Sequence, residues 1–469
     1  MGLTLATKLP SVGAIAAALV GALVVIAALA LLMRRRPDAF ALLAIAALPF
    51  RLPISAEGRT VNLLIPLYLV VAAGIVALLV PRLLARRRGS YTKATGEPAH
   101  EPGAPDGRPR GHSRRERGVS LRDPASWLSP RGLEVLLLTA VALYAVQTSY
   151  SADQTKAAQN VAFFYVPFVL LYVLLRQQHW TRELLLACFG VAVAEAVVFA
   201  GVGFVEYERK ALLLNPKVVA ANQYDNYFRV NSLFFDPSIY GRFLALVMLG
   251  VSTAVLWTRR RRDVLLGGAV LLWLLGGLVT SFSQSSIAAL LLGLALLAAW
   301  RWDVRGTLYV AAALLAIAAV LVVVSPPGLH IGLKGSGGSA SNATSGRTKL
   351  VSKGLALFAD RPLQGFGSGS FALEYRRHEK VTGESASTAS HTIPVTVAAE
   401  QGIVGLALYV ALLVVAFVVL FRGAGRSPPR VAIAACFAAL VLHTWTYADF
   451  LEDPLTWTLL GIGVALARE

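Results

Sequence analysis

The sequence has 469 residues, of which 56% are hydrophobic, and its formal net charge is +18 at pH 7. Soluble domains do not have this apolar content, whereas polytopic membrane proteins do. The positive charge does not indicate nucleic-acid binding, because it lies in short clusters directly after apolar runs and not on a folded soluble module.

The apolar runs predict an all-α membrane protein with about 12–13 transmembrane helices, since each run reaches or approaches the ~20 residues that span a bilayer core. The first run is too long and too uniformly apolar for a cleaved signal peptide, so we interpret it as a retained helix. Two short runs, 39–56 and 453–467, are either spans or re-entrant segments. The predicted spans are 12–33, 39–56, 61–84, 133–150, 159–176, 183–205, 239–257, 264–281, 283–300, 307–325, 403–421, 430–449 and 453–467.

The basic clusters predict the topology. If Arg34 to Arg36 are cytoplasmic, strict alternation of the spans puts every later cluster on the same side, as the positive-inside rule requires. The two cysteines, Cys188 and Cys436, lie within apolar runs and are expected to pack there. The chain then divides into N-terminal transmembrane helices (1–88), a disordered basic cytoplasmic linker (89–131), a transmembrane core (132–325) with an external loop at 206–238, a long, partly helical extracytoplasmic loop (326–391) and C-terminal transmembrane helices (392–469).

Four of the seven histidines, His330, His378, His391 and His443, lie outside the membrane or near its outer boundary in this topology. His391 begins the stretch "HTIPVTVAAEQGIVG", where the long polar loop meets an apolar helix. A neutral imidazole there can accept a proton from a hydroxyl group. The alternative is a helix-capping or interfacial histidine, and the residues alone do not decide between the two.

Several arginines are predicted on the outer side, against the general cytoplasmic bias of basic residues. A guanidinium binds phosphate oxygens bidentately and stays charged, so this group predicts a site for a phosphorylated lipid headgroup. Arg242 falls in the first turns of a span, where an arginine is costly unless it has a partner. The alternative is ordinary pairing with Asp236, Glu374 or Glu379, or with lipid phosphates. The candidate phosphate-binding residues are Arg229, Arg347, Arg242, Arg376 and Arg377.

Glycines mark two further features. "RPLQGFGSGSF" predicts a turn built on Pro362, Gly365 and Gly367, and Gly402 and Gly405 are expected to allow close helix packing. No metal-ligand spacing such as HExxH, DxD or CxxC occurs in an external loop, so no metal and no cofactor is predicted.

These motifs together resemble the O-antigen ligase and polymerase superfamily of bacterial membrane glycosyltransferases. The resemblance lies in "GRTKL" with Arg347, "RPLQGFGSGSF", and "HTIPVTVAAEQGIVGL" with His391. Upstream, "RVNSLFFDPSIYGRFLALVM" is similar to the family's other arginine segment, led by Arg229, and "SFSQSSIAALLLGLALL" to its serine-rich helix start. Three features depart from the family: Thr392 replaces the usual asparagine, Ser283-Gln284 replaces a serine-arginine pair, and the three N-terminal spans and the linker are additional or divergent.

The resemblance implies a GT-C-like fold and an inverting, metal-independent glycan transfer at the outer leaflet of the inner or plasma membrane. The donor would be an undecaprenyl-diphosphate-linked glycan, and the acceptor a hydroxyl of a glycan, lipid or protein. His391 would act as general base, while Arg229 and Arg347 would bind the diphosphate. Membrane lipids would be the other partners, and nucleic acid would not be one.

Three alternatives remain open. Within the superfamily, a polymerase would add one carrier-linked chain to another. A transporter of polyprenyl-linked glycans would predict paired intramembrane charges and an internal repeat, and the sequence shows only scattered candidates such as Glu195 and Arg242. A receptor or scaffold would leave the outward arginines unexplained.

Overall fold

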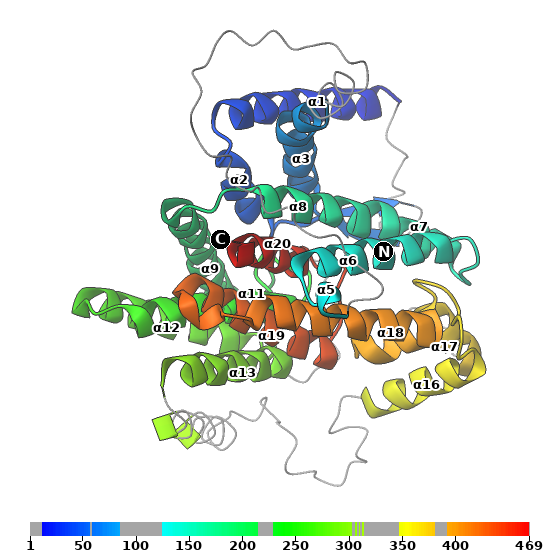
Figure 1. Cartoon of the computed structure of the whole chain (residues 1–469). Helices are drawn as coiled ribbons and strands as arrows, with labels where there is room; N and C mark the ends of the chain where they lie inside the picture. Colours follow the sequence, from blue (N-terminus) through cyan, green and yellow to red (C-terminus); the bar gives the residue numbers. More distant parts are fainter. Residues whose placement is uncertain are drawn as a thin grey trace, which may run out of the picture.

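A computed structural model describes residues 12–56, 59–84, 124–213, 228–302, 305–306, 309, 312–313, 347–379 and 392–468. Within these residues the chain is helical apart from one two-stranded hairpin (Figure 1). Nine of the described helices are long and apolar enough to cross a membrane, and α20 is a shorter apolar helix. The predicted class, an all-α polytopic membrane protein, is confirmed.

The elements follow in chain order. The N-terminal part holds α1 (Val12–Arg35), α2 (Ala39–Ala47), β1 (Leu52–Ala56), β2 (Arg59–Leu63), α3 (Ile65–Gly74) and the π-helix η1 (Ile75–Leu79). The middle part holds α5 (Pro124–Trp127), α6 (Pro130–Gln147), α7 (Gln154–Asn160), the π-helix η2 (Val161–Tyr165), α8 (Val166–Gln177), α9 (Arg182–Arg209), α11 (Pro237–Trp257), α12 (Arg261–Thr280) and α13 (Gln284–Arg301). The last part holds α16 (Arg347–Asp360), α17 (Phe371–Glu379), α18 (Ile393–Phe421), η4 (Ala424–Arg426), α19 (Pro428–Thr446) and α20 (Pro454–Arg468).

Side-chain caps fix where several helices begin. Asp236 Oδ1 accepts hydrogen bonds from the backbone N–H groups of Ser238 (2.6 Å) and Ile239 (3.3 Å), and Pro237 occupies the first turn of α11. Ser283 caps α13 and Thr181 caps α9 in the same way. Such residues satisfy backbone donors that have no partner within the helix. These caps hold the starts of α11 and α13 in place, next to the candidate site.

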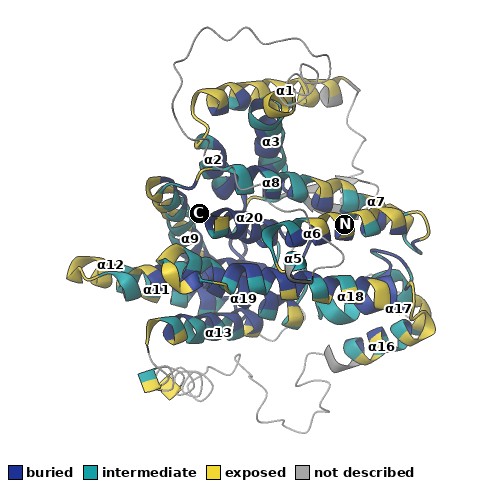
Figure 2. Cartoon of the chain, viewed as in Figure 1, coloured by how far each residue is buried: buried dark blue, intermediate teal, exposed yellow. Residues whose placement is uncertain are grey.

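The centre of the bundle is α11, with α13 and α19 packed against it (Figure 2). In α11, 78% of the membrane-length window is buried, against 11% in α1, so α11 is central and α1 peripheral. Small side chains allow the close approach of these helices, as is common between membrane helices. In α13, Gly293 makes room for Leu249 of α11, and α19 buries four alanines, Ala434, Ala435, Ala438 and Ala439.

The helix ends form two polar layers. At the end that we call the arginine end, Arg176 and Arg468 both pair with Glu134, and Arg82 donates to Gln177 Oε1 (2.8 Å). The opposite end, which we call the loop end, carries the β-hairpin, α16 and α17, the last two at the right of Figure 1. The starts of α11, α13, α18 and α20 all belong to the loop end. Of the described helices, α11, α13 and α20 therefore run away from the loop end, whereas α9 and α12 run toward it.

Two predicted boundaries are wrong for identifiable reasons. The run 39–56 does not form one span: α2 ends at Ala47, and β1 then pairs with β2 from Leu52↔Leu63 to Ala56↔Arg59. Pro49 and Pro53 interrupt helical hydrogen bonding in this stretch. The run 403–421 is part of a longer helix, because α18 already begins at Ile393 and carries a non-helical residue, Gly402, inside it.

Some predicted features lie outside the described residues. These are His330 and His391, nearly all of the span 307–325, residues 89–123 of the linker, and loop residues 326–346 and 380–391.

Candidate active site

Arg229 lies at the loop end, just before α11, and is half-buried. Its Nε–H donates to the carbonyl oxygen of Ser281 (3.1 Å), and its Nη2 lies 3.4 Å from Ser238 Oγ. The first contact is the stronger, because 3.4 Å is near the outer limit for a hydrogen bond. The backbone follows the same path, since Val230 N–H donates to the carbonyl of Thr280 (3.2 Å). Arg229 is thus held against the turn between α12 and α13.

That turn, residues 281–286, is rich in buried serines, and we call it the serine turn. Ser283 Oγ lies 2.7 Å from Ser286 Oγ, and Ser286 Oγ donates to the carbonyl of Ser238 at the start of α11 (3.2 Å). Gly241 of α11 allows this packing, because a Cβ there would lie 2.8 Å from Ser286 Oγ. From α19, the Nε2 of the buried His443 lies 3.1 Å from the same oxygen. The serine turn therefore ties α11, α13 and α19 together beneath Arg229.

Arg242 has a partner within the protein. Its Nη2 lies 2.6 Å from Asp453 Oδ2, and both side chains are almost fully buried. Its Nη1 also contacts the carbonyl oxygens of Ala448 (3.3 Å) and Asp449 (3.5 Å). We predicted this arginine among the phosphate-binding residues, but this pairing commits its charge to the fold, so we do not include it in the proposed site.

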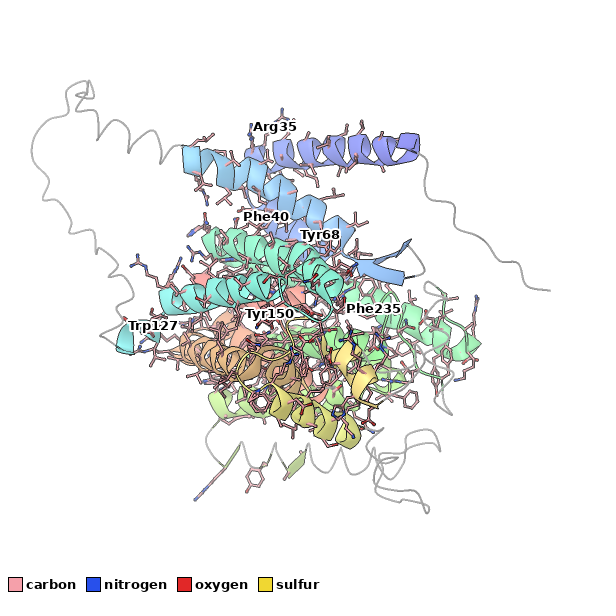
Figure 3. All side chains as sticks on the ribbon, turned by 90° about the vertical axis from the view of Figure 1, so that its right-hand side faces the viewer. Arg35, Phe40, Tyr68, Trp127, Tyr150 and Phe235 are labelled. Carbon is pink, nitrogen blue, oxygen red and sulfur yellow. The ribbon has the colours of Figure 1, made fainter. Side chains whose placement is uncertain are left out.

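Other charged groups of the loop end surround this pair. Arg51, which follows α2, stacks on the ring of Phe235 at 4.8 Å (Phe235 is labelled in Figure 3). Burial lowers the pKa of Arg51, against the opposing effect of Asp453 and Asp449 nearby. Burial likewise raises the pKa of Asp449, against the effect of Arg242 and Arg51. The N-terminal and C-terminal parts of the chain thus share one buried charge cluster.

The glycine turn, residues 362–370, is held between α18 and the loop after α6. Gly367 has φ +91°, and a Cβ there would lie 2.4 Å from Ser151 Cα, so only glycine fits without strain. Ser151 Oγ donates to the carbonyl of Ser368 (2.8 Å), and Tyr150 OH donates to that of Gln364 (3.2 Å; Figure 3 labels Tyr150). Gly365 also has a positive φ, of +66°.

Glu400 holds the other side of the glycine turn. Its two carboxylate oxygens accept hydrogen bonds from the backbone N–H groups of Gly369 and Phe371, each at 3.0 Å. Next to it, Gly402 breaks α18 with φ +63° and presses against the backbone of Leu363. Just after this break in α18, Ile403 N–H donates to the carbonyl of Pro362 (2.7 Å). Gly405 keeps a helical backbone, and the side chain of Gln401 lies over it.

Helix α16 lies beside the first turns of α18 and runs in the same direction. Gly354 of α16 packs against Val395 of α18. Further along the two segments, Ile403 N–H donates to the carbonyl of Pro362. Because the two contacts have the same spacing in the sequence, the middle of α16 lies beside the first turn of α18. Arg347 begins α16 ahead of this contact, and His391, two residues before α18, is outside the described residues. The structure therefore brings the helix that begins at Arg347 alongside the first turns of α18.

The two arginines of α17 differ in their surroundings. Arg377 is exposed and pairs with Glu374 at 2.6 Å, which is the ordinary pairing that the sequence left open. Arg376 is half-buried. Phe371 and Tyr375 stack in parallel (6.2 Å between ring centres) and join α17 to α16 and α18 in a small separate core. The helix α17 thus presents basic side chains at the rim of the loop end.

An apolar groove lies between α9 and α12 near the loop end. Its volume is about 460 Å³, and its lining is almost wholly apolar. Phe282, which belongs to the serine turn, forms part of its wall, and Lys210 Nζ lies 3.4 Å from the centre of the Tyr207 ring, another lining residue. The full lining is Phe204, Tyr207, Leu272, Leu275, Gly276, Val279, Thr280 and Phe282.

Sequence reasoning missed Glu400 and Asp453 as site residues and noted His443 only for its place near the boundary. Glu400 and Asp453 could have been noticed as acids next to membrane-length apolar runs, in "AAEQG" and "LEDP". Within the described residues, no group of three or more His, Cys, Asp or Glu side chains could hold a metal ion.

Residues 268–410 match the family model described as O-antigen ligase. The match covers most of α12, then α13, α16 and α17, and the first part of α18, and it includes Arg347, the glycine turn and His391. No curated protein matches the chain. Over these residues the match supports the predicted resemblance to the O-antigen ligase and polymerase superfamily. Arg229, Arg242 and His443 lie outside the matched segment.

Proposed function

We propose that this protein transfers a glycan from undecaprenyl diphosphate to an acceptor hydroxyl at its loop end. The observation that carries the proposal is the arrangement of that end. Arg229, held against the serine turn, lies at the loop end together with the starts of α16 and α18, and the sequence puts Arg347 at the first of these starts and His391 two residues before the second. The O-antigen ligase match supports the class of reaction.

We place the loop end on the extracytoplasmic side. The arginine end carries Arg82, Arg176 and Arg468, together with the exposed cluster Arg259 to Arg262 before α12. Basic residues near transmembrane ends favour the cytoplasm. The loop end then faces the outer leaflet, where the diphosphate of a polyprenyl-linked donor lies at the membrane surface.

Arg229 and Arg347 bind the diphosphate of the donor. A guanidinium matches phosphate oxygens with two parallel hydrogen bonds and keeps its charge at every relevant pH. The helices α11, α13, α16 and α18 all start at this end, so their helix dipoles add partial positive charge there. These groups stabilise the negative charge that develops on the leaving diphosphate.

His391 is the general base of the reaction. It takes the proton of the acceptor hydroxyl as that oxygen bonds to the anomeric carbon, while the bond from this carbon to the phosphate oxygen breaks. Undecaprenyl diphosphate leaves with the electron pair, and the single displacement inverts the anomeric configuration. Diphosphate is a good leaving group and the arginines offset its charge, so neither a protein acid nor a metal ion is required.

The groove between α9 and α12 fits the isoprenoid chain of the donor. It is apolar, and its wall includes Phe282, the neighbour of the serine that anchors Arg229. A lipid in this groove would bring its diphosphate to Arg229, with Lys210 close by. The fit of tail and headgroup to adjoining surfaces favours a lipid-linked donor.

The same donor chemistry serves a polymerase, in which the acceptor is a second carrier-linked chain. Transport is less well supported. In a transporter, the paired charges of the substrate site are expected near the bilayer midplane. Here Arg242 and Asp453 pair at the starts of α11 and α20, at the loop end.

The test is a transfer assay with purified protein in nanodiscs, in a buffer that contains EDTA. The donor is a short undecaprenyl-diphosphate oligosaccharide, tested with candidate acceptors or with donor alone, and the readout is released undecaprenyl diphosphate. We expect His391→Ala to lower the rate by about 10²–10⁴-fold, the usual contribution of a general base. The control is His378→Ala, on the outer face of α17, which should keep the wild-type rate. Equal rates in wild type and His391→Ala would reject the role of His391, and the lack of release by wild type with every acceptor would reject the function.

A further inference from the structure

His443 is a buried histidine that the mechanism above does not use. It lies in the last turn of α19, with no exposed surface, and its Nε2 is 3.1 Å from Ser286 Oγ and 3.3 Å from Ser285 Oγ. A buried polar side chain is costly unless it makes hydrogen bonds. A leucine would fill a similar volume without that cost. Packing alone therefore does not explain a histidine at this position.

The hydrogen bonds around Ser286 determine which atom of His443 carries a hydrogen. A serine hydroxyl has one hydrogen to donate and can accept two bonds. Ser286 donates its hydrogen to the carbonyl of Ser238 (3.2 Å). Its oxygen must then accept from its two other close neighbours, Ser283 Oγ at 2.7 Å and His443 Nε2. His443 is therefore a donor at Nε2.

Ser286 connects His443 Nε2 to the residues that contact Arg229. Ser286 binds the carbonyl of Ser238, and the hydroxyl of Ser238 lies 3.4 Å from Arg229 Nη2. On the other side, Ser286 belongs to the serine turn, whose Ser281 carbonyl accepts from Arg229 Nε at 3.1 Å. These two contacts of Arg229 are thus made to the serine turn and to the start of α11, which Ser286 links to His443.

We propose that His443 is a positioning residue for Arg229: its Nε2–H fixes the serine turn and the start of α11 so that the guanidinium faces the diphosphate of the donor. This role rests on the proposed function, because it assigns Arg229 to donor binding. Loss of the Nε2–H would leave the chain folded and His391 in place, but would let the serine turn that holds Arg229 shift. Because Arg229 both binds the diphosphate and stabilises its leaving charge, the defect should appear in kcat/KM for the donor.

Two substitutions separate hydrogen bonding from packing. His443→Leu keeps the volume and removes the donor, whereas His443→Gln places an amide N–H where Nε2 lies. We expect His443→Leu to lower kcat/KM for the undecaprenyl-diphosphate donor about tenfold, the effect of one hydrogen bond. We expect His443→Gln to restore most of this loss. A purely packing role would give the opposite order, with leucine better tolerated than glutamine.

Coupling to Arg229 gives a second kinetic test. If His443 acts through Arg229, His443→Leu should add little to the effect of Arg229→Ala, because the group that it positions is already gone. If the double variant shows the product of the two single effects, the two residues act independently and the proposal is wrong.

A readout that needs no activity separates this inference from the proposed function. Modification of Arg229 by phenylglyoxal, followed by mass spectrometry, reports how firmly its guanidinium is held. We expect His443→Leu to speed modification of Arg229 and to leave that of the exposed Arg377 unchanged, with His443→Gln close to wild type. Unchanged labelling of Arg229 in a folded His443→Leu protein would overturn the proposal even if glycan transfer is found. Faster labelling in a protein that transfers no glycan would support the hydrogen-bond role and reject the function instead.

Discussion

At the residue scale, the Arg242–Asp453 pair shows how a charge can be placed within a membrane bundle. The two side chains are 1% and 2% exposed, so neither can be solvated if its partner is removed. Removing one member of such a pair typically costs about 3–5 kcal/mol. We expect Arg242→Met and Asp453→Leu each to lower the unfolding temperature in detergent.

The double variant is the control for this prediction. Arg242→Met with Asp453→Leu removes both charges, so it should be more stable than either single variant. Unfolding temperatures equal to wild type in both single variants would show that the pair is not what holds α11 to α20.

Glu452 gives a pH-dependent prediction. Its Oε1 accepts hydrogen bonds from Asn160 Nδ2 (2.8 Å) and Tyr165 OH (3.2 Å), and burial raises the pKa of its carboxyl. A pKa raised in the folded state means that the folded protein holds the proton more tightly. The free energy of unfolding therefore falls as pH rises from the ordinary value of about 4.3 through the raised value.

Glu452→Gln should remove that slope, because the amide oxygen still accepts both bonds and never ionises. We expect the variant to unfold at a higher temperature than wild type above the raised pKa, and the difference to shrink toward pH of about 4. The measurement is thermal unfolding of both proteins across this range. A difference that does not change with pH would contradict the prediction.

Sequence reasoning located several of these residues but not their partners. Arg242 stood out because an arginine inside an apolar run needs a partner, yet Asp453 is far away in the chain and becomes its neighbour only when α20 packs into the bundle. Glu400 was missed, because its role depends on the glycine turn folding back onto α18. Long-range packing, which no local pattern encodes, decided both.

At the element scale, the break in α18 depends on Gly402. An alanine there would be forced to φ +63°, with its Cβ 2.4 Å from the carbonyl oxygen of Leu363. Residues held in this region cost about 1–3 kcal/mol. We expect Gly402→Ala to lower the unfolding temperature and to open the glycine turn to limited proteolysis.

Gly268 in α12 provides the matched control. A Cβ there would meet nothing within 4 Å, and alanine is favoured over glycine in helices by about 1 kcal/mol. Gly268→Ala should be neutral or slightly stabilising. If both alanine variants behave alike, the clamp between the glycine turn and α18 does not depend on the backbone of Gly402.

Helices were easier to predict than the features that interrupt them. Long apolar runs located most helices within a few residues, because apolar composition persists along each. The hairpin at 52–63 was missed, since Leu52 and Ile54 extend the apolar run of α2, although Pro49 and Pro53 signal the change. The early start of α18 was missed because its first turns, "IPVTVAAEQ", are only moderately apolar.

At the scale of the whole molecule, the two polar layers make a prediction about topology. Arg377 of α17 and Arg260 before α12 are both exposed, but belong to the loop end and to the arginine end respectively. Both native cysteines are buried, so they should give little background. We expect a membrane-impermeant maleimide to label Arg377→Cys in intact cells and Arg260→Cys only after permeabilisation. The reverse pattern would place the proposed site in the cytoplasm.

At this scale the sequence predicted best what composition and local motifs determine. The apolar runs predicted the all-α membrane class, and the motifs around Arg347 and the glycine turn pointed to the family that the match supports. The contacts that hold Arg229 were not predictable from composition or local motifs. They need the serine turn, the start of α11 and His443 of α19 to meet, and these segments are distant in the sequence.

The most direct test of the account is the rate at which purified protein, in nanodiscs with EDTA, releases undecaprenyl diphosphate from a lipid-linked oligosaccharide. Three proteins are compared: wild type, Arg229→Ala and the exposed control Arg377→Ala. The account predicts release by wild type and by Arg377→Ala, and a rate lower by about 10²-fold in Arg229→Ala, as expected when a group that stabilises the leaving charge is lost. A wild-type rate in folded Arg229→Ala would contradict the central claim, that this loop-end arginine binds the diphosphate of the donor.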